Sequence, residues 1–267
     1  MSPPPLVETT RSAFWASDEA HYHGHRVFKE LAGKESWTGM MGLSLFGRKI
    51  PPDICGVLDD AVGALTLADP RIWPLKLTRV VGSYGGLLPA LFAGQLAEDG
   101  ARIGPWACVE AAKALLLLHA EIDGQQDDVE HVSRVVAEYR RKHRFVWGFG
   151  TPYRGRDERV VAFRRSMEQR QRSELPYYRT MNAVARAMKE ATGAEPNIGG
   201  VMASALLDMD LEPLEVGATV VAVIQHMFFS QALESTRAPN LTLRELPSEY
   251  VTYRGHEPRT SPRGRPL

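Results

Sequence analysis

Apolar residues recur at helical spacing along most of this 267-residue chain, and this periodicity restricts the fold more than any single motif does. In the segment 52–69, Ile54, Leu58 and Leu65 fall on one face of a helix. Similar helices are expected at 75–100, 105–122, 127–145, 157–172, 177–193, 197–209 and 212–236. No segment is typical of a parallel-sheet strand, and no repeat of fixed period is present. The fold class is therefore predicted to be all-α.

The two ends of the chain and one internal proline depart from this pattern. The first dozen residues contain three consecutive prolines and are expected to form a mobile tail. The segment 20–28 alternates in polarity around Gly24, which predicts a small N-terminal β-hairpin. Pro89 is expected to kink or interrupt the helix at 75–100. The last thirty residues, rich in proline and arginine, predict an extended tail.

Composition excludes several classes of protein. Hydrophobic residues make up 44% of the chain and charged residues 24%, as in globular domains and unlike disordered chains. The 32 basic residues balance the 32 acidic ones, so no overall field attracts nucleic acid or an anionic membrane. Cys55 and Cys108 are too few for a disulfide framework, which indicates a reducing compartment. We therefore expect a cytoplasmic protein with no nucleic-acid partner.

Neither a leader peptide nor a membrane span is expected. The N-terminus lacks a basic region followed by an apolar run. The longest apolar stretch contains Gln225 and His226, which favours a buried core helix over a membrane span. His226 is also a candidate acid or base, because two adjacent polar side chains in a buried helix need partners. His119, alone in another apolar helix, is interpreted as a core histidine with a hydrogen-bond partner.

Two groups of basic side chains could be functional, but each is also explained by its place in the secondary structure. His21, His23 and His25 have the two-residue spacing of metal ligands on a strand, but a turn at Gly24 would separate them. We expect solvated hairpin histidines and no metal site. The basic segment 134–145 is interpreted as the solvated C-terminal end of a helix, although it would also suit a phosphate-bearing ligand nearby.

The segment 146–160, VWGFGTPYRGRDERV, is the best candidate for a ligand loop. It is neither a P-loop nor a dinucleotide fingerprint. Backbone amides at Gly148, Phe149 and Gly150 would line a ligand, and Arg154, Arg156 and Arg159 would supply anion partners. The alternative is a plain interhelical loop with a solvated cluster of charges.

Five segments in order, among them this loop, resemble the citrate synthase superfamily. They are 46–62 (FGRKIPPDICGVLDDAV), 80–100 (VVGSYGGLLPALFAGQLAEDG), 146–160, 195–234 (beginning EPNIGG) and 246–255 (LPSEYVTYRG). The loop resembles the family's GFGH and DPR motifs, and EPNIGG resembles its PNVD motif. The similarity covers roughly residues 25 to 256, and the length is closest to the short citryl-CoA lyase branch.

The resemblance implies a two-domain helical homodimer with a cleft between the domains. The large domain would comprise 1–107 and 211–267, and the small domain 108–210. In the family, the cleft binds an acyl-CoA and an oxo-acid as small-molecule substrates, without a tightly bound cofactor. One histidine and an aspartate handle the proton at the thioester α-carbon, and a second histidine polarises the oxo-acid carbonyl.

This chain departs from the family at four functional positions, where the usual side chain is replaced by one that cannot do its work. The replacements are Pro105 or Trp106 for the GPLHGG histidine, Thr151 for the GFGH histidine, Gly199 for the PNVD aspartate and Gln225 for an oxo-acid-binding arginine. Threonine is no acid or base near neutral pH, and glycine carries no functional group. The resemblance together with these losses excludes ordinary citrate synthesis and indicates a less anionic substrate. Arg159, which matches the DPR arginine, is kept.

Two hypotheses remain open. The first is a divergent enzyme that makes or breaks a carbon–carbon bond, or transfers an acyl group, on a non-standard substrate such as a CoA thioester. Its catalytic candidates are Thr151, His226 and Glu158, with CoA against Gly148, Phe149 and Gly150. Its substrate-binding candidates are Trp106, Tyr153, Arg154, Arg159, Asn197, Gly199 and Gln225. The second is a catalytically inactive homologue that serves as a ligand-binding or partner subunit.

Overall fold

The protein is built almost entirely of helices in the computed structural model, which describes residues 8–16, 19–99, 103–151, 157–237 and 247–256. The helices are α1 (Trp37–Phe46), α2 (Pro52–Leu65), α3 (Trp73–Tyr84), α4 (Leu87–Asp99), α5 (Gly104–Ile122), α6 (Val129–Lys142), α7 (Glu158–Gln169), α8 (Pro176–Thr192), α9 (Ile198–Leu207) and α10 (Pro213–Ser235). Short helical turns lie at Val27–Leu31 and Ser248–Tyr250. The prediction of an all-α fold is confirmed.

The small N-terminal sheet is the part of the described chain that is not helical. It contains three antiparallel strands, β1 (Phe14–Ala16), β2 (Glu19–Tyr22) and β3 (His25–Arg26), in that order. The predicted hairpin is β2–β3, with Tyr22 opposite His25 and the turn at His23–Gly24. β1 was not predicted. Arg11 just before it forms an ion pair of 2.6 Å with Glu215 on α10. Residues 1–7 of the expected mobile tail lie outside the described residues, so the tail stays a prediction.

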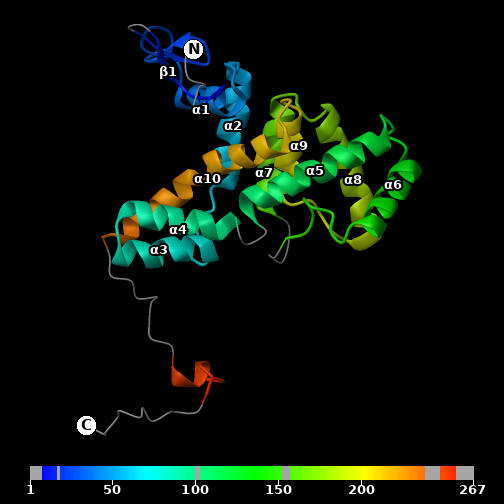
Figure 1. Ribbon diagram of the computed structural model, residues 1–267. Coiled ribbons are helices and arrows are strands. Elements are labelled where there is room, and N and C mark those ends of the chain that lie inside the picture. The colour runs from blue at the N-terminus through cyan, green and yellow to red at the C-terminus, as the bar shows by residue number, and fades with distance from the viewer. Residues whose placement is uncertain (1–7, 17–18, 100–102, 152–156, 238–246, 257–267) are drawn as a thin grey trace, which may run out of the picture.

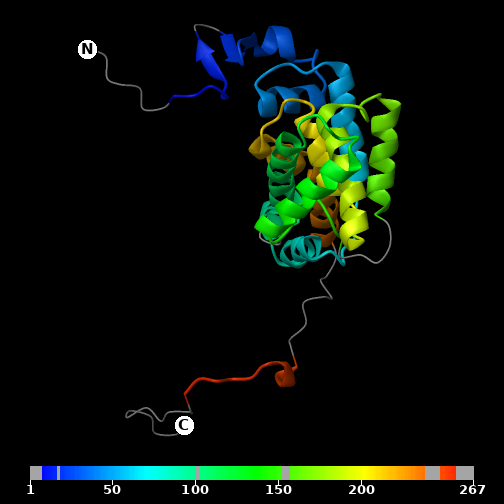
Figure 2. The ribbon, with the colours of Figure 1, turned by 90° about the vertical axis from the view of Figure 1, so that its right-hand side faces the viewer.

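Helix α10 is the central element of the helical body (Figure 1). It packs against α5 over much of its length and against α2, α3 and α4, while α5 also packs against α9. Figure 2 shows the N-terminal sheet and the C-terminal segment 247–256 at opposite ends of this body. A central helix covered on several sides must be apolar around most of its circumference, which explains the long apolar run of α10.

Two groups of buried side chains form the core. The larger one joins α2, α5, α7, α9 and α10 and includes the fully buried Phe163, Met202 and Phe228. The smaller one joins the second half of α5 to α6 and α8, around Ile122 and Val184. The smaller group lies wholly within 108–210, but the larger one contains residues from both proposed domains. The domain boundary therefore stays a prediction.

The long helix expected at 75–100 is two helices. α3 ends at Tyr84 and α4 begins at Leu87, so the interruption falls at Gly85 and Gly86 and not at Pro89. Pro89 lies in the first turn of α4, where a backbone N–H would have no partner within the helix, so proline is tolerated there. The helix α1 was not predicted either. It begins with a Ser36 cap on the Gly39 N–H.

The loop 148–151 lies directly on the start of α9. The Asn197 N–H donates to the Gly148 carbonyl at 2.9 Å, and the Gly150 N–H donates to the Glu195 carbonyl at 2.9 Å. A Cβ atom on Gly200 would lie 2.5 Å from the Gly148 oxygen, too close for any side chain. Gly148 itself has a φ of +90°, which only glycine adopts readily. Both glycines are therefore required for this contact.

We predict opposite effects on stability from two glycine-to-alanine changes. Gly200→Ala should destabilise the protein by about 1–3 kcal/mol, because the methyl group meets backbone atoms that cannot move independently. Gly63→Ala, in α2 with open space around its Cα, should stabilise it by about 0.5–1 kcal/mol through helix propensity. Chemical denaturation of both variants measures the difference. Equal effects would contradict the close contact of the loop with α9.

Candidate functional site

A pocket of about 690 Å³ lies beside this loop, in the range typical of small-molecule sites. Its lining comes from residues 65–75, 98–108, 145–151 with Arg159, 197–202 and 220–228. Most of the lining side chains are apolar, among them Leu75, Ile224 and Phe228. Segments from both sides of the proposed domain boundary therefore meet around one cavity, and its few polar groups decide what chemistry it can support.

Arg159 reaches the pocket from the first turn of α7 and is held by its neighbour Asp157. Its Nε and Nη2 atoms donate to the two Asp157 carboxylate oxygens, each at 2.9 Å. Burial alone would raise the pKa of Asp157, but the hydrogen bonds and charge of Arg159 outweigh it and lower the pKa. The pair fixes the guanidinium and neutralises much of its charge. An anionic ligand would therefore meet a weaker positive field than an unpaired arginine offers.

Glu98 places a carboxyl group in the same pocket from the last turn of α4. Its Oε2 atom is buried and has no hydrogen-bond partner among the described residues. Burial, and secondarily the charge of Asp99, raises the pKa of Glu98 to about 7. Gly104, with φ +60°, makes room for this side chain, since a Cβ there would lie 2.7 Å from the Glu98 Oε1 atom. A buried carboxyl that titrates near neutrality is typical of functional sites.

Cys108, on α5, is buried at the pocket wall next to Gly199. A Cβ atom on Gly199 would lie 3.2 Å from the Cys108 Sγ atom. Burial, then the nearby charge of Glu98, raises the pKa of Cys108 to about 12 despite the opposing charge of Arg159. The thiol is therefore neutral at physiological pH and unsuited to nucleophilic attack. A side chain at position 199, where the resemblance expects an aspartate, would therefore be in tight contact with this thiol.

Asn197 is the residue that joins the loop to α9. Its Oδ1 atom accepts from the Gly200 N–H at 3.1 Å, capping α9, and its Nδ2 atom donates to the Gly150 carbonyl at 2.9 Å. Asn197, Gly199, Thr151 and the segment 148–150 all line the pocket. The structure thus brings together these sequence candidates and Arg159. Tyr153, Arg154 and Arg156 lie outside the described residues.

Four other sequence candidates do not line the pocket. Trp106 is 46% exposed, with the Lys113 ammonium 5.3 Å from its ring centroid. Gln225 bonds to Gln95 and to the Val221 carbonyl within the α4–α10 contact.

His226 shares a hydrogen bond of 2.7 Å with the Thr66 hydroxyl, and Glu158 is exposed in the first turn of α7. Their proposed functional roles receive no support from the pocket.

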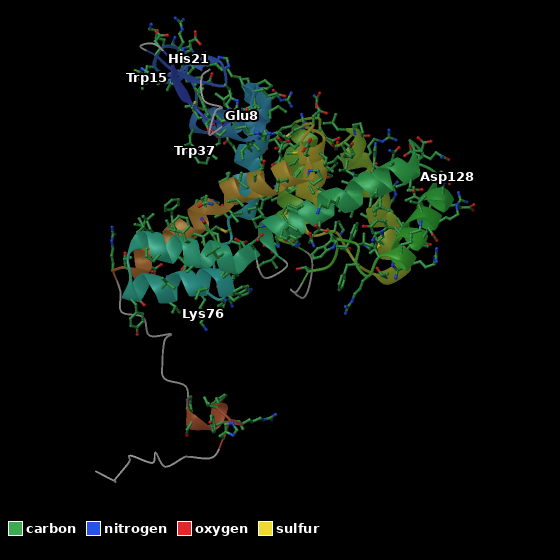
Figure 3. All side chains as sticks on the ribbon, in the orientation of Figure 1. Glu8, Trp15, His21, Trp37, Lys76 and Asp128 are labelled. Carbon is green, nitrogen blue, oxygen red and sulfur yellow. The ribbon has the colours of Figure 1, made fainter. Side chains whose placement is uncertain are left out.

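The other histidines considered in the sequence analysis also lie outside the pocket lining. The Nδ1 atom of His119 shares a hydrogen bond of 2.7 Å with the Thr180 hydroxyl, as expected of a core histidine. His21, His23 and His25 are separated by the β2–β3 turn, and Figure 3 shows His21 on the sheet at the N-terminal end of the molecule. Within the described residues no three histidine, cysteine or acidic side chains are placed to hold a metal ion.

The sequence missed Glu98 as a functional residue. The sequence predicted the helix that carries Glu98, but it gave no reason to prefer Glu98 over the adjacent Asp99 as a pocket residue. The available signal was its place at the end of an apolar helix, six residues before Gly104. Only the packing of α4 against α5 turns Glu98 into the cavity and leaves Asp99 exposed.

Comparisons with solved structures show the fold. The chain matches citryl-CoA lyase from Hydrogenobacter thermophilus with a TM-score of 0.80 and 18% identity, over 97% of this chain and 98% of that one. It matches Methanosaeta concilii ATP citrate lyase in complex with (3S)-citryl-CoA with a TM-score of 0.73 and 17% identity, over 96% of this chain but 43% of the other. Citrate synthase from Thermoplasma acidophilum gives a TM-score of 0.62 and 14% identity, over 86% of this chain and 60% of that one.

These matches confirm the expected citrate synthase-like fold. No protein-family model matches the sequence, and no curated protein matches it. At identities of 14% to 18%, the shared fold does not carry over an activity. The function of the pocket must be argued from its own residues.

We predict that Glu98 makes stability fall as the pH rises. The unfolded carboxyl loses its proton near pH 4.5, whereas the folded one retains it to about pH 7. The free energy of unfolding therefore decreases between these two pH values and levels off above them. From pH 5 to pH 8, the stability of Glu98→Gln relative to the wild type should rise by on the order of 2 kcal/mol, discounted for partial exposure.

Denaturant unfolding of the two proteins at both pH values measures this difference. Asp208, whose pKa burial raises to about 6, contributes equally to both proteins and cancels in the comparison. A difference that does not change with pH would contradict the altered titration of Glu98.

Proposed function

We propose that the protein is a divergent citrate synthase-like enzyme. It forms or cleaves a carbon–carbon bond, or transfers an acyl group, on a CoA thioester, and it does not make or cleave citrate. The observation that carries this proposal is the apolar pocket, which is lined by both Arg159 and Glu98 and in which the Glu98 Oε2 atom is buried. A thioester α-proton is weakly acidic, so its removal needs a base and a donor for the enolate oxygen acting together.

The charges around the pocket favour a substrate whose reacting part is uncharged. Arg159 is paired with Asp157, and Arg71 at the pocket is paired with Asp69 through two Nε bonds of 3.0 and 2.9 Å. Glu98 adds a further acidic group. Because these arginines already neutralise Asp157 and Asp69, a substrate with two or three carboxylates would bury negative charges that they balance only weakly, which is costly. An acyl group with an apolar body would instead fit against α10.

Several contacts are assigned to the substrate within this proposal. The loop 148–150 contacts the CoA portion through its backbone, and Thr151 donates a hydrogen bond to the substrate. Arg159 anchors an anionic group of the ligand, and Asn197 holds the loop in place through its bond to Gly150. No tightly bound cofactor is needed, because the thioester is itself the substrate.

The second candidate function is a catalytically inactive homologue that binds a ligand or a partner subunit. The four replaced family residues favour it, since binding alone needs no new catalyst. Against it, a buried carboxyl without a hydrogen-bond partner lowers stability, and a purely structural protein has no use for that cost. Activity on any thioester distinguishes the two.

We also propose that the protein is a homodimer. Leu88, Phe92 and Leu96 lie four residues apart on one face of α4, and each is more than half exposed. Phe229 and Leu233 are exposed on α10, which packs against α4. Exposed apolar side chains gathered on two packed helices favour an interface, and two copies related by a two-fold axis are the commonest way to cover one.

A membrane is the other surface that could cover apolar helices. By length and composition, α10 and the stretch 87–122 would each be able to cross a membrane. However, 61% of the apolar window of α10 and 44% of the other are buried inside the protein, as in core helices. Cys55 and Cys108 are both free thiols. We therefore propose a cytoplasmic protein whose partners are a second copy and a small molecule, with no membrane or nucleic acid.

The proposed function predicts that CoA thioesters bind to the pocket. In a panel of CoA, short and longer acyl-CoAs, oxaloacetate and citrate, at least one CoA compound should raise the unfolding temperature by several degrees. A ligand at a hundred times its Kd adds about 2.7 kcal/mol to the stability. Arg159→Ala should abolish this shift, whereas the matched Arg165→Ala, exposed on the same helix, should retain it. The absence of a shift with every CoA compound would refute the thioester assignment.

The proposed homodimer predicts a change of mass on substitution of its apolar face. The wild type should sediment as a dimer, and Phe92→Arg should sediment as a monomer with unchanged far-ultraviolet circular dichroism. Val129→Arg, at an equally exposed apolar side chain on α6, is the matched control and should remain dimeric. A monomeric wild type, or a dimeric Phe92→Arg variant, would contradict the assigned interface.

A further inference from the structure

We propose that Glu98 is the proton-transfer residue of the pocket: its carboxylate removes the α-proton of a bound thioester, and its acid form returns a proton to the same carbon. This inference rests on the proposed function and names the group that carries out its chemistry. The histidine and the aspartate that the resemblance would assign to this step are missing from their positions, so another group must act if the site is catalytic.

The geometry supports Glu98 because its carboxyl faces the cavity without being used elsewhere. Glu98 lines the pocket, its Oε2 atom is buried, and no described residue hydrogen-bonds to that atom. Other acidic side chains at or near the pocket are occupied: Asp157 holds Arg159, and Asp69 holds Arg71. A buried carboxyl oxygen with no protein partner is a group available to a ligand.

The other candidates for proton transfer are less suitable. The Cys108 thiol has a pKa of about 12 and stays protonated at neutral pH. A threonine hydroxyl such as that of Thr151 donates hydrogen bonds but does not accept a proton near neutrality. His226 and Glu158 lie outside the pocket lining. Among the described lining residues, Glu98 is thus the group with the required chemistry.

The charges around Glu98 leave both protonation states accessible. Asp99, on the same helix, raises the pKa of Glu98, and the neutral Cys108 thiol lies near Glu98 on α5. Two arginines line the same cavity, Arg159 from α7 and Arg71 from the segment before α3. The net result is a pKa of about 7, dominated by burial. A base is most effective when its pKa lies near the working pH, because the reactive form is populated and still basic.

The step balances without any oxidant or cofactor. The α-carbon–hydrogen bond breaks, an oxygen–hydrogen bond forms on Glu98, and the electron pair moves to the thioester oxygen as an enolate. Arg159 lines the same cavity as Glu98. In this proposal its guanidinium stabilises the negative charge that develops on the oxygen. Return of the proton reverses the step.

Hydrogen–deuterium exchange at the α-carbon tests this step without a second substrate. The acyl-CoA that gives the largest thermal shift is incubated in heavy water with the protein, and deuterium uptake is measured by mass spectrometry. The wild type should catalyse exchange, with a rate that rises with pH and levels off above about 7. Glu98→Gln should lower the rate by about 10²–10⁴-fold while retaining the thermal shift. Glu190→Gln, at an exposed carboxyl on α8, is the matched control and should exchange like the wild type.

The outcomes separate this inference from the proposed function. Normal exchange in Glu98→Gln would overturn the role of Glu98 and leave a thioester enzyme with another base. Binding without exchange in the wild type would overturn it as well and favour the inactive homologue. No thermal shift with any CoA compound would overturn both proposals. Infrared spectra provide a second measurement. The wild type should show a protonated-carboxyl band that disappears between pH 6 and 8, and Glu98→Gln should lack this band. Absence of the band from the wild type would refute the proposed titration of Glu98.

Discussion

The contact between the loop 148–151 and the start of α9 is the constraint on which the site depends. Two glycines, Gly148 and Gly200, let one backbone lie against the other, and Asn197 ties the loop to the helix on both sides of that contact. A side chain at either glycine would push the loop away and open the pocket wall. The loop glycines therefore serve the architecture of the pocket, whichever side chain stands at position 151.

The helical fold could be predicted well because its signal is local, whereas the site could not because its signal is not. A helix such as α5 is specified by the spacing of its own apolar residues, and the break at Gly85 and Gly86 was misplaced by only a few residues. Glu98 becomes a pocket residue through the packing of α4 against α5. This packing cannot be read from any single stretch of the sequence. The same limit applies to His226, whose neighbour Gln225 indicated buried polarity but whose partner, Thr66, is 160 residues away.

The resemblance to a family directed attention to the segments around the pocket, but only some of the candidate residues line it. The candidates in the loop 148–151 and at the start of α9 do so. Trp106 and Gln225, chosen as replacements for lost family side chains, lie outside it. Position in a motif locates a backbone, but a replaced side chain need not point where its predecessor pointed. Candidates obtained by substitution are therefore weaker than those obtained from an intact motif.

The surroundings of position 199 and of Glu98 bear on which of the two places could carry the proposed proton-transfer carboxyl. An aspartate at position 199 would face the Cys108 thiol, and the nearby Arg159 is already paired with Asp157. A carboxylate there would crowd the thiol and meet an arginine whose charge is already balanced, so its charged form would be costly to bury. Glu98, at the end of an apolar helix, is accommodated in the cavity, and burial there makes it more basic. A site that must remove a weakly acidic proton next to an apolar acyl group gains from this arrangement, whereas a site that must hold a tricarboxylate loses from it.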